Sequence, residues 1–270
     1  DCLPYDRISP SREVMGLRMD ALRVWLEGET DNRILVTSLD ALLQRVPPAD
    51  VIHEASYELE TGAFFDRPRF EAFTARTGYL VDSVVDEPGE VALREDFVEI
   101  YPAGGDLPMR IVLDEDGTID ELRFYDPTTQ RTIETVARMV FGPASELILK
   151  DAEAAAPGDD LAMEQRLRRH YEHLHPVLDI LPPGPVILAQ EVADRLDVYL
   201  DIIAEAKSAQ SMLAGINNGG GSLYLAKSEW TKSLRRHHTR NLPLSLGAGR
   251  QTSAGRRHER LPRVASWRIS

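Results

Sequence analysis

The sequence has one cysteine, Cys2, and no long apolar run. A single cysteine excludes an internal disulfide framework and is typical of a protein from a reducing compartment, so we expect a cytoplasmic location. A membrane-spanning helix requires about 18 or more consecutive apolar residues, so we also expect no membrane contact. The content of 43% hydrophobic and 28% charged residues is ordinary for a globular protein with a buried core.

A nucleotide site is also missing. A P-loop needs glycines followed by a lysine and a hydroxyl residue, and the sequence contains no Gly-Lys pair. The glycine cluster at 215–222 has no lysine. The segment Tyr79–Glu87 ends in acids, as a magnesium-binding strand does, but without a P-loop a solvated turn is the favoured interpretation. We therefore expect no ATPase site and no cofactor in this chain.

Metal-binding and catalytic patterns are weak. His170, His173 and His175 cluster near the end of a predicted helix, with a spacing that zinc can use. Arg168 and Arg169 flank them and no cysteine is near, so solvated or partly packed histidines are favoured. No pattern pairs the many acids into a catalytic dyad. We therefore expect no metal site, and residue chemistry alone does not support enzymatic activity.

The net charge of −13 is unevenly distributed. Residues 231–270 hold ten Lys or Arg and one acid, Glu259, for a charge of +9, and the other 230 residues hold 21 bases and 43 acids, for −22. Phosphate backbones repel such an acidic body, so non-specific DNA binding by residues 1–230 is not expected. Residues 246–270 lack hydrophobic periodicity, which predicts a disordered basic tail.

The first 55 residues have an α/β pattern. Helical spacing over 11–27, with Ser9 or Ser11 as a cap, precedes a continuous apolar run at 34–38 that suits a buried parallel strand. A short helix then ends at Pro47-Pro48. A similar α/β pattern returns after about 160, with a buried strand at 184–189, a long helix over 190–214, and a last strand and helix over 222–234.

Residues 56–142 predict a small strand-rich domain. Asp66 can cap a helix over 67–77 that Gly78 closes. Turn residues, including Asp116-Gly117, separate the apolar pieces that follow. We expect strands at Tyr79–Val85, Val91–Tyr101, Met109–Leu113 and Ile119–Tyr125.

Two arginines of this domain, Arg94 and Arg110, are candidates for a binding surface, because arginine suits bidentate recognition of carboxylates. On spacing alone, ordinary solvated strand residues are the simpler interpretation. A hairpin that turns at Ala103–Asp106 would bring both to one face. We expect them to be exposed there, so that their removal changes stability by roughly half a kcal/mol at most.

Several ordered segments resemble one bacterial family. LPYDRISPS (3–11) with ILVTSLDALLQRVPP (34–48), GEVALREDFVEIYPAGGDLPMRI (89–111) and LRFYDPTTQRT (122–132) resemble the UvrB-like region of transcription-repair coupling factors (Mfd). Gln130-Arg131 favours this family over UvrB itself. The resemblance implies a mixed α/β fold: a degenerate helicase-like (UvrB-type) α/β domain, interrupted by an inserted small strand-rich α+β domain.

The resemblance also implies domains. Residues 1–55 would be a first UvrB-homology segment, truncated at its start, and 56–142 an inserted UvrA-binding domain. Residues 143–245 would be the returning α/β segment, and 246–270 the disordered basic tail.

The function implied is recruitment of UvrA, which links stalled RNA polymerase to nucleotide excision repair. Arg94 and Arg110 match the family's UvrA-binding arginines by position. The family is an ATP-dependent DNA translocase, so ATP, Mg²⁺, DNA and RNA polymerase would be bound by domains outside this chain. Glu95 replaces the family's usual glycine, and Leu113 and Asp114 replace aromatic residues, which predicts weaker and more electrostatic binding. The alternative is an independent nucleic-acid-binding factor that acts through the basic tail.

Overall fold

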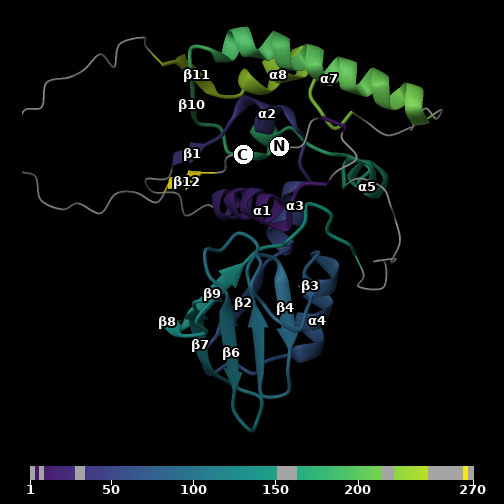
Figure 1. Ribbon diagram of the computed structural model, residues 1–270. Coiled ribbons are helices and arrows are strands. Elements are labelled where there is room, and N and C mark those ends of the chain that lie inside the picture. The colour runs from purple at the N-terminus through teal and green to yellow at the C-terminus, as the bar shows by residue number, and fades with distance from the viewer. Residues whose placement is uncertain are drawn as a thin grey trace, which may run out of the picture. The chain divides into compact units, whose positions relative to one another are not determined.

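The computed structural model describes residues 4–5, 9–27, 34–150, 163–214, 222–242 and 264–266 (Figure 1). The chain forms two compact units with mixed α/β content. The first combines residues 1–2, 7–28 and 47–173, and the second combines 3–6, 29–46 and 174–270. The predicted mixed α/β class is confirmed at this level, since both units contain helices and strands.

A six-stranded sheet is the centre of the first unit, with the strand order β3-β4-β5-β6-β7-β8. All neighbouring pairs are antiparallel except β3–β4, which is parallel. A separate antiparallel pair joins β2 to β9. The strand bounds are β2 Tyr57–Glu60, β3 Leu80–Val81, β4 Glu90–Leu93, β5 Phe97–Ile100, β6 Met109–Leu113, β7 Ile119–Tyr125, β8 Thr132–Val136 and β9 Arg138–Phe141.

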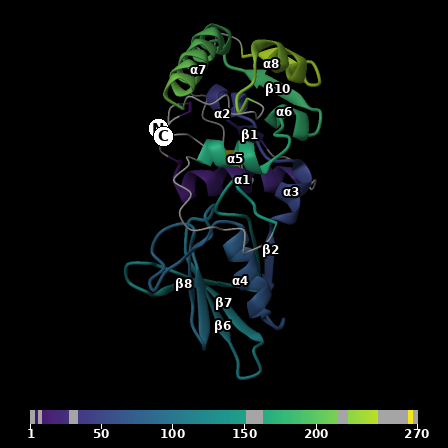
Figure 2. The same cartoon turned by 90° about the vertical axis from the view of Figure 1, so that its right-hand side faces the viewer.

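Helix α4 (Arg67–Arg76) covers one face of this sheet (Figure 2). The Asp66 side chain accepts a hydrogen bond from the Arg69 N–H at its start, and Gly78 follows with a φ of +84°, as the predicted cap and closing glycine require. Phe70 and Phe73 of α4 are buried against alternate residues of the strands. The core therefore lies on the α4 side of the sheet. The side chains of the intervening strand residues lie on the opposite face.

Helix α1 (Arg12–Leu26) belongs to the same unit, and its cap is Ser11, one of the two predicted candidates. A Cβ added at Gly16 would lie 2.3 Å from the Ala103 Cβ, so only glycine permits this close approach. Arg18 forms a buried ion pair of 2.9 Å with Glu146. These contacts join α1 to the connection after β5 and to the segment after β9. Helices α3 (Ala49–Glu54) and α5 (Met163–His170) complete the unit.

The second unit contains two parallel strand pairs, β1–β12 and β10–β11. The Leu43 and Leu225 backbones are joined by a hydrogen bond of 2.8 Å, and Arg45 forms an ion pair of 2.6 Å with Glu229. The elements are β1 Ile34–Val36, α2 Leu39–Leu43, α6 Val177–Ile180, β10 Pro185–Leu188, α7 Val192–Ala214, α8 Lys227–Leu234, β11 His238–Asn241 and β12 Val264–Ser266.

Four strand predictions need correction. The predicted buried strands β1 and β10 are largely exposed, with Ile34 at 55% and Ile187 at 65%, because each pairs with one neighbour among the described residues. The predicted single strand Val91–Tyr101 is a hairpin, β4–β5, because three consecutive charged residues at 94–96 form a turn. The predicted last strand is reduced at Tyr224 to an isolated bridge with Gln44.

Most of the predicted basic tail lies outside the described residues. Within it, Val264–Ser266 forms β12 beside β1. The other residues of 246–270 lie outside the described residues, so the disorder predicted for them stays a prediction. Within the described residues, no helix is long and apolar enough to span a membrane.

Candidate partner-binding site

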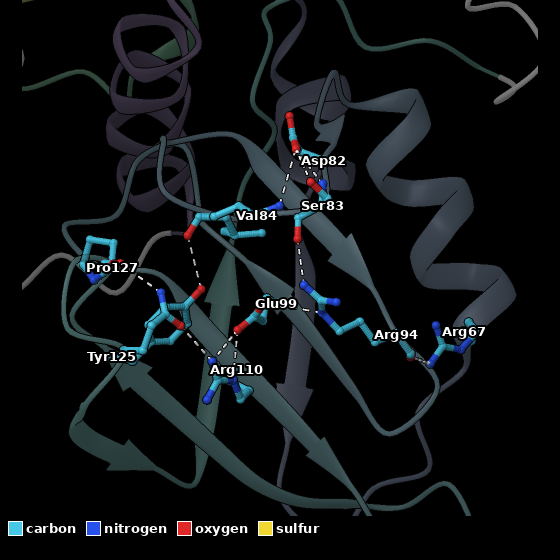
Figure 3. Close-up of polar contacts among 11 residues, drawn as sticks. Arg67, Asp82, Ser83, Val84, Arg94, Glu99, Arg110, Tyr125 and Pro127 are labelled. Carbon is cyan, nitrogen blue, oxygen red and sulfur yellow. Dashed lines mark hydrogen bonds and ion pairs between the residues drawn. The ribbon is translucent and has the colours of Figure 1, made fainter.

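The two predicted arginines meet at Glu99, on the face of the sheet opposite to α4 (Figure 3). Val98 and Ile100 of β5 belong to the core, so strand alternation directs Glu99 to the other face. Glu99 is the register partner of Arg110 on β6. Its Oε1 accepts hydrogen bonds from Arg110 Nε at 2.9 Å and from Nη2 at 2.5 Å. Its Oε2 lies 4.0 Å from Arg94 Nε.

Burial distinguishes the three charged groups. The Glu99 side chain is 7% exposed, Arg110 is 28% exposed and Arg94 is 48% exposed. A buried carboxylate is stable only when charge-assisted hydrogen bonds replace the lost water, and Arg110 supplies two of them. Arg110 is therefore the internal counter-ion of Glu99, whereas Arg94 is the more accessible cation.

Two aromatic rings support the guanidinium groups. The Phe97 ring centroid lies 5.4 Å from Arg94 Cζ and 5.2 Å from Arg110 Cζ. The Tyr125 ring centroid lies 4.9 Å from Arg110 Cζ. These separations are within the range of cation–π attraction. Burial raises the pKa of the Tyr125 hydroxyl, and the neighbouring Glu99 carboxylate raises it further. Both arginines are thus held over aromatic surfaces.

Arg94 belongs to the turn between β4 and β5. Its Nη2 donates a hydrogen bond of 2.7 Å to the Ser83 carbonyl oxygen. From α4, Arg67 Nη2 donates to the carbonyl oxygens of Arg94 at 2.5 Å and of Glu95 at 3.4 Å. The hydrogen bonds that Asp82 Oδ1 accepts lower the pKa of that carboxyl and order the backbone on either side of Ser83. Both ends of the Arg94 residue, backbone and side chain, are therefore fixed.

A third group, Gln130, reaches Arg110 from the turn between β7 and β8. Its Oε1 accepts a hydrogen bond of 3.0 Å from Arg110 Nη2. Its Nε2 donates to the Pro127 carbonyl oxygen at 2.9 Å. The Asp126 carboxylate accepts hydrogen bonds from the Thr129 and Thr128 N–H groups, which lower the pKa of Asp126. The Gln130 amide is thus held at its oxygen by Arg110 of β6 and at its nitrogen by the turn.

The structure brings the two predicted residues together, but not on two strands of one hairpin. Strand β5 lies between β4 and β6, and Arg94 is in the preceding turn. The expectation of exposed side chains is wrong for Arg110, because it covers Glu99 and is itself half-buried. Glu99, Phe97 and Gln130 were not among the site residues predicted from the sequence. Alternation within β5 could have placed Glu99 opposite the core, whereas Gln130 was marked only as part of a family resemblance and not as a partner of Arg110.

The predicted histidine cluster does not converge. His170 Nε2 lies 2.8 Å from the Ile148 carbonyl oxygen, the exposed His173 is 3.6 Å from Glu172, and His175 exchanges backbone hydrogen bonds with Val46. Among the described residues, no group of three or more His, Cys, Asp or Glu side chains is arranged to hold a metal ion.

Comparison with known proteins identifies the strand-rich region. Residues 57–147 match the family described as the UvrB interaction domain. The chain is 31% identical over 189 residues to the transcription-repair-coupling factor of Myxococcus xanthus. The aligned segment covers 68% of this chain and 15% of the Myxococcus protein. The Bacillus subtilis transcription-repair-coupling factor is 30% identical over 145 residues. These residues make up 54% of this chain and 12% of the Bacillus subtilis protein.

The matched length is a small part of these relatives, 12–15% of each. The match to the UvrB interaction domain includes Arg94 and Arg110. It also includes the residues that contact them: Arg67, Ser83, Phe97, Glu99, Tyr125 and Gln130. The resemblance predicted from the sequence is therefore confirmed: this chain is similar to transcription-repair-coupling factors, and its residues 57–147 match the UvrB interaction domain family.

Proposed function

We propose that this chain recruits the repair protein UvrA through the face of the sheet that carries Arg94 and Arg110. In the full-length relatives this step would couple transcription to nucleotide excision repair. Contacts to RNA polymerase and DNA, and an ATP-driven motor, would then belong to parts of such proteins beyond this region. The parallel strand pairs of the second unit support the proposal that it is the degenerate helicase-like domain.

One observation carries the proposal. Arg94 and Arg110 share Glu99 and the Phe97 ring, so two cations are ordered side by side within a UvrB interaction domain. Among the described residues, Nη1 of each guanidinium has no hydrogen-bond partner. Each arginine therefore keeps donors for a partner, and little side-chain entropy remains to be lost on binding.

The test is a titration of UvrA from the same organism against the full chain, by calorimetry. Arg94→Ala and Arg110→Ala should each weaken binding by on the order of 1–4 kcal/mol, as interface arginines often do. Their losses should be non-additive, because both side chains contact Glu99. Measurement at two salt concentrations will separate long-range attraction from direct contact.

Arg123→Ala is the matched control. Arg123 lies on β7 as the register partner of Arg110, and it forms an ion pair with the exposed Glu121 instead of with Glu99. Its removal subtracts the same charge from the same row of the sheet. Unchanged UvrA affinity in the Arg94→Ala/Arg110→Ala double variant, or an equal loss in Arg123→Ala, would remove the arginine pair from the interface.

A further inference from the structure

Arg110 has few hydrogen-bond donors left for a partner. A guanidinium carries five N–H groups, one on Nε and two on each terminal nitrogen. Nε donates to Glu99, and Nη2 donates to both Glu99 and Gln130, so the hydrogens on these two nitrogens are used. Within the described part of the chain, only Nη1 keeps free donors. A bidentate contact to a carboxylate needs two adjacent nitrogens, so that geometry is blocked while Gln130 stays in place.

Gln130 occupies its position at a conformational cost. Its φ is +59°, which lies in the left-handed region. Residues other than glycine, asparagine and aspartate rarely adopt this conformation. The turn nevertheless holds it there, because the Gln130 N–H donates to the Asp126 carbonyl oxygen at 2.8 Å and the side-chain amide donates to Pro127. A non-glycine residue kept in this region by surrounding contacts often has a role beyond folding.

We propose that Gln130 is a positioning residue of the UvrA-binding site. It and Glu99 hold the Arg110 guanidinium from two sides, so that Nη1 alone faces the partner. UvrA then meets Arg110 with one oxygen of a carboxylate, and the second oxygen of that carboxylate is bound elsewhere or by water. This inference rests on the proposed function and adds the residue that sets the contact geometry.

The test compares Gln130→Gly with wild type in the UvrA titration and in thermal melts of the full chain. Glycine accepts a positive φ without strain, so the melting temperature should be unchanged or higher. Loss of the amide releases Arg110 on one side, so UvrA must order this side chain when it binds. The entropy cost of ordering one long side chain should lower UvrA affinity roughly two- to twelvefold. A merely structural role would instead lower the melting temperature. Thr128→Ala, in the same turn, is the control and should preserve affinity, because Thr128 is used through its backbone N–H.

Two further variants separate the possible failures. In the Arg110→Ala background, Gln130→Gly should cause no additional loss of affinity, because Gln130 acts through Arg110. An additional loss there, or wild-type affinity for Gln130→Gly alone, would overturn the positioning role. If Arg110→Ala itself binds UvrA as wild type does, the proposed function of the arginine pair fails, and this inference fails with it.

Discussion

Removal of Arg110 should destabilise the strand-rich unit, although the residue is charged and lies near the surface. In Arg110→Ala, the Glu99 carboxylate stays buried but loses hydrogen bonds of 2.9 and 2.5 Å, and its nearest remaining cation in the described structure is Arg94 at 4.0 Å. An unsatisfied buried acceptor costs about 1–3 kcal/mol, and the lost cation–π contacts add about 0.5–1 kcal/mol. We therefore expect a total loss of roughly 1.5–4 kcal/mol.

Arg94→Ala should cost much less. Arg94 is 48% exposed, and its ion pair with Glu99 is long. Solvent screening limits such a pair to about 0–1 kcal/mol. Arg123→Ala should stay within roughly half a kcal/mol, because Arg123 and its partner Glu121 are both exposed by more than a third. The largest loss is thus expected for Arg110, which is the arginine that makes short hydrogen bonds to a buried carboxylate.

The assay is urea unfolding of the full chain, followed by circular dichroism, with a thermal melt as a second probe. One kcal/mol corresponds to about 2–4 °C for a unit of this size, so Arg110→Ala should lower the melting temperature by several degrees. A second substitution, Glu99→Leu in the Arg110→Ala background, should recover at least half of the loss, because it removes the uncompensated charge. UvrA affinity should stay low in that double variant.

Two results would refute this reasoning. Wild-type stability of Arg110→Ala would mean that Glu99 does not depend on Arg110 for its burial. A double variant no more stable than Arg110→Ala would mean that lost packing, and not the buried charge, is the cause. Either way, UvrA titrations of Arg110→Ala must be made at a temperature where the variant is fully folded.

The remaining predictions concern the turns and the missing nucleotide site. Arg67→Ala should weaken UvrA binding with little change in melting temperature, because Arg67 holds the backbone of the Arg94 turn from α4; equal affinity in a side-by-side titration would contradict this. The pKa of the Asp126 carboxyl should lie below its ordinary value of 3.8 in the folded protein. The stability that Asp126 contributes to the turn is then complete above pH 3.8 and is lost as the pH falls through the lower pKa of the folded state. An NMR titration of Asp126 with a midpoint at or above 3.8 would contradict this prediction. The chain should not bind ATP, since the sequence has no Gly-Lys pair, and saturable ATP binding at micromolar concentration would disprove that prediction.

The sequence by itself determined the features that depend on neighbouring residues. Ser11 and Asp66 marked the starts of α1 and α4 because a cap bonds within one helical turn. Asp116-Gly117 marked a hairpin turn, and Gly117 has a φ of +80°. Arg94 and Arg110 were selected by their place in a resembling segment. Each of these inferences needs only a short window of the chain, so no knowledge of the fold was required.

Tertiary structure decided which groups meet. Glu99 and Gln130 are separated from Arg110 by 11 and 20 residues, and only the order of β5, β6 and β7 with the turn after β7 brings the three together. The exposure of Ile34 and Ile187 likewise depends on how many strands flank them, which an apolar run does not encode. The half-burial of Arg110 has the same origin. Burial and hydrogen bonding between distant residues are properties of strand pairing, so the candidate residues could be read from the sequence, while their geometry could not.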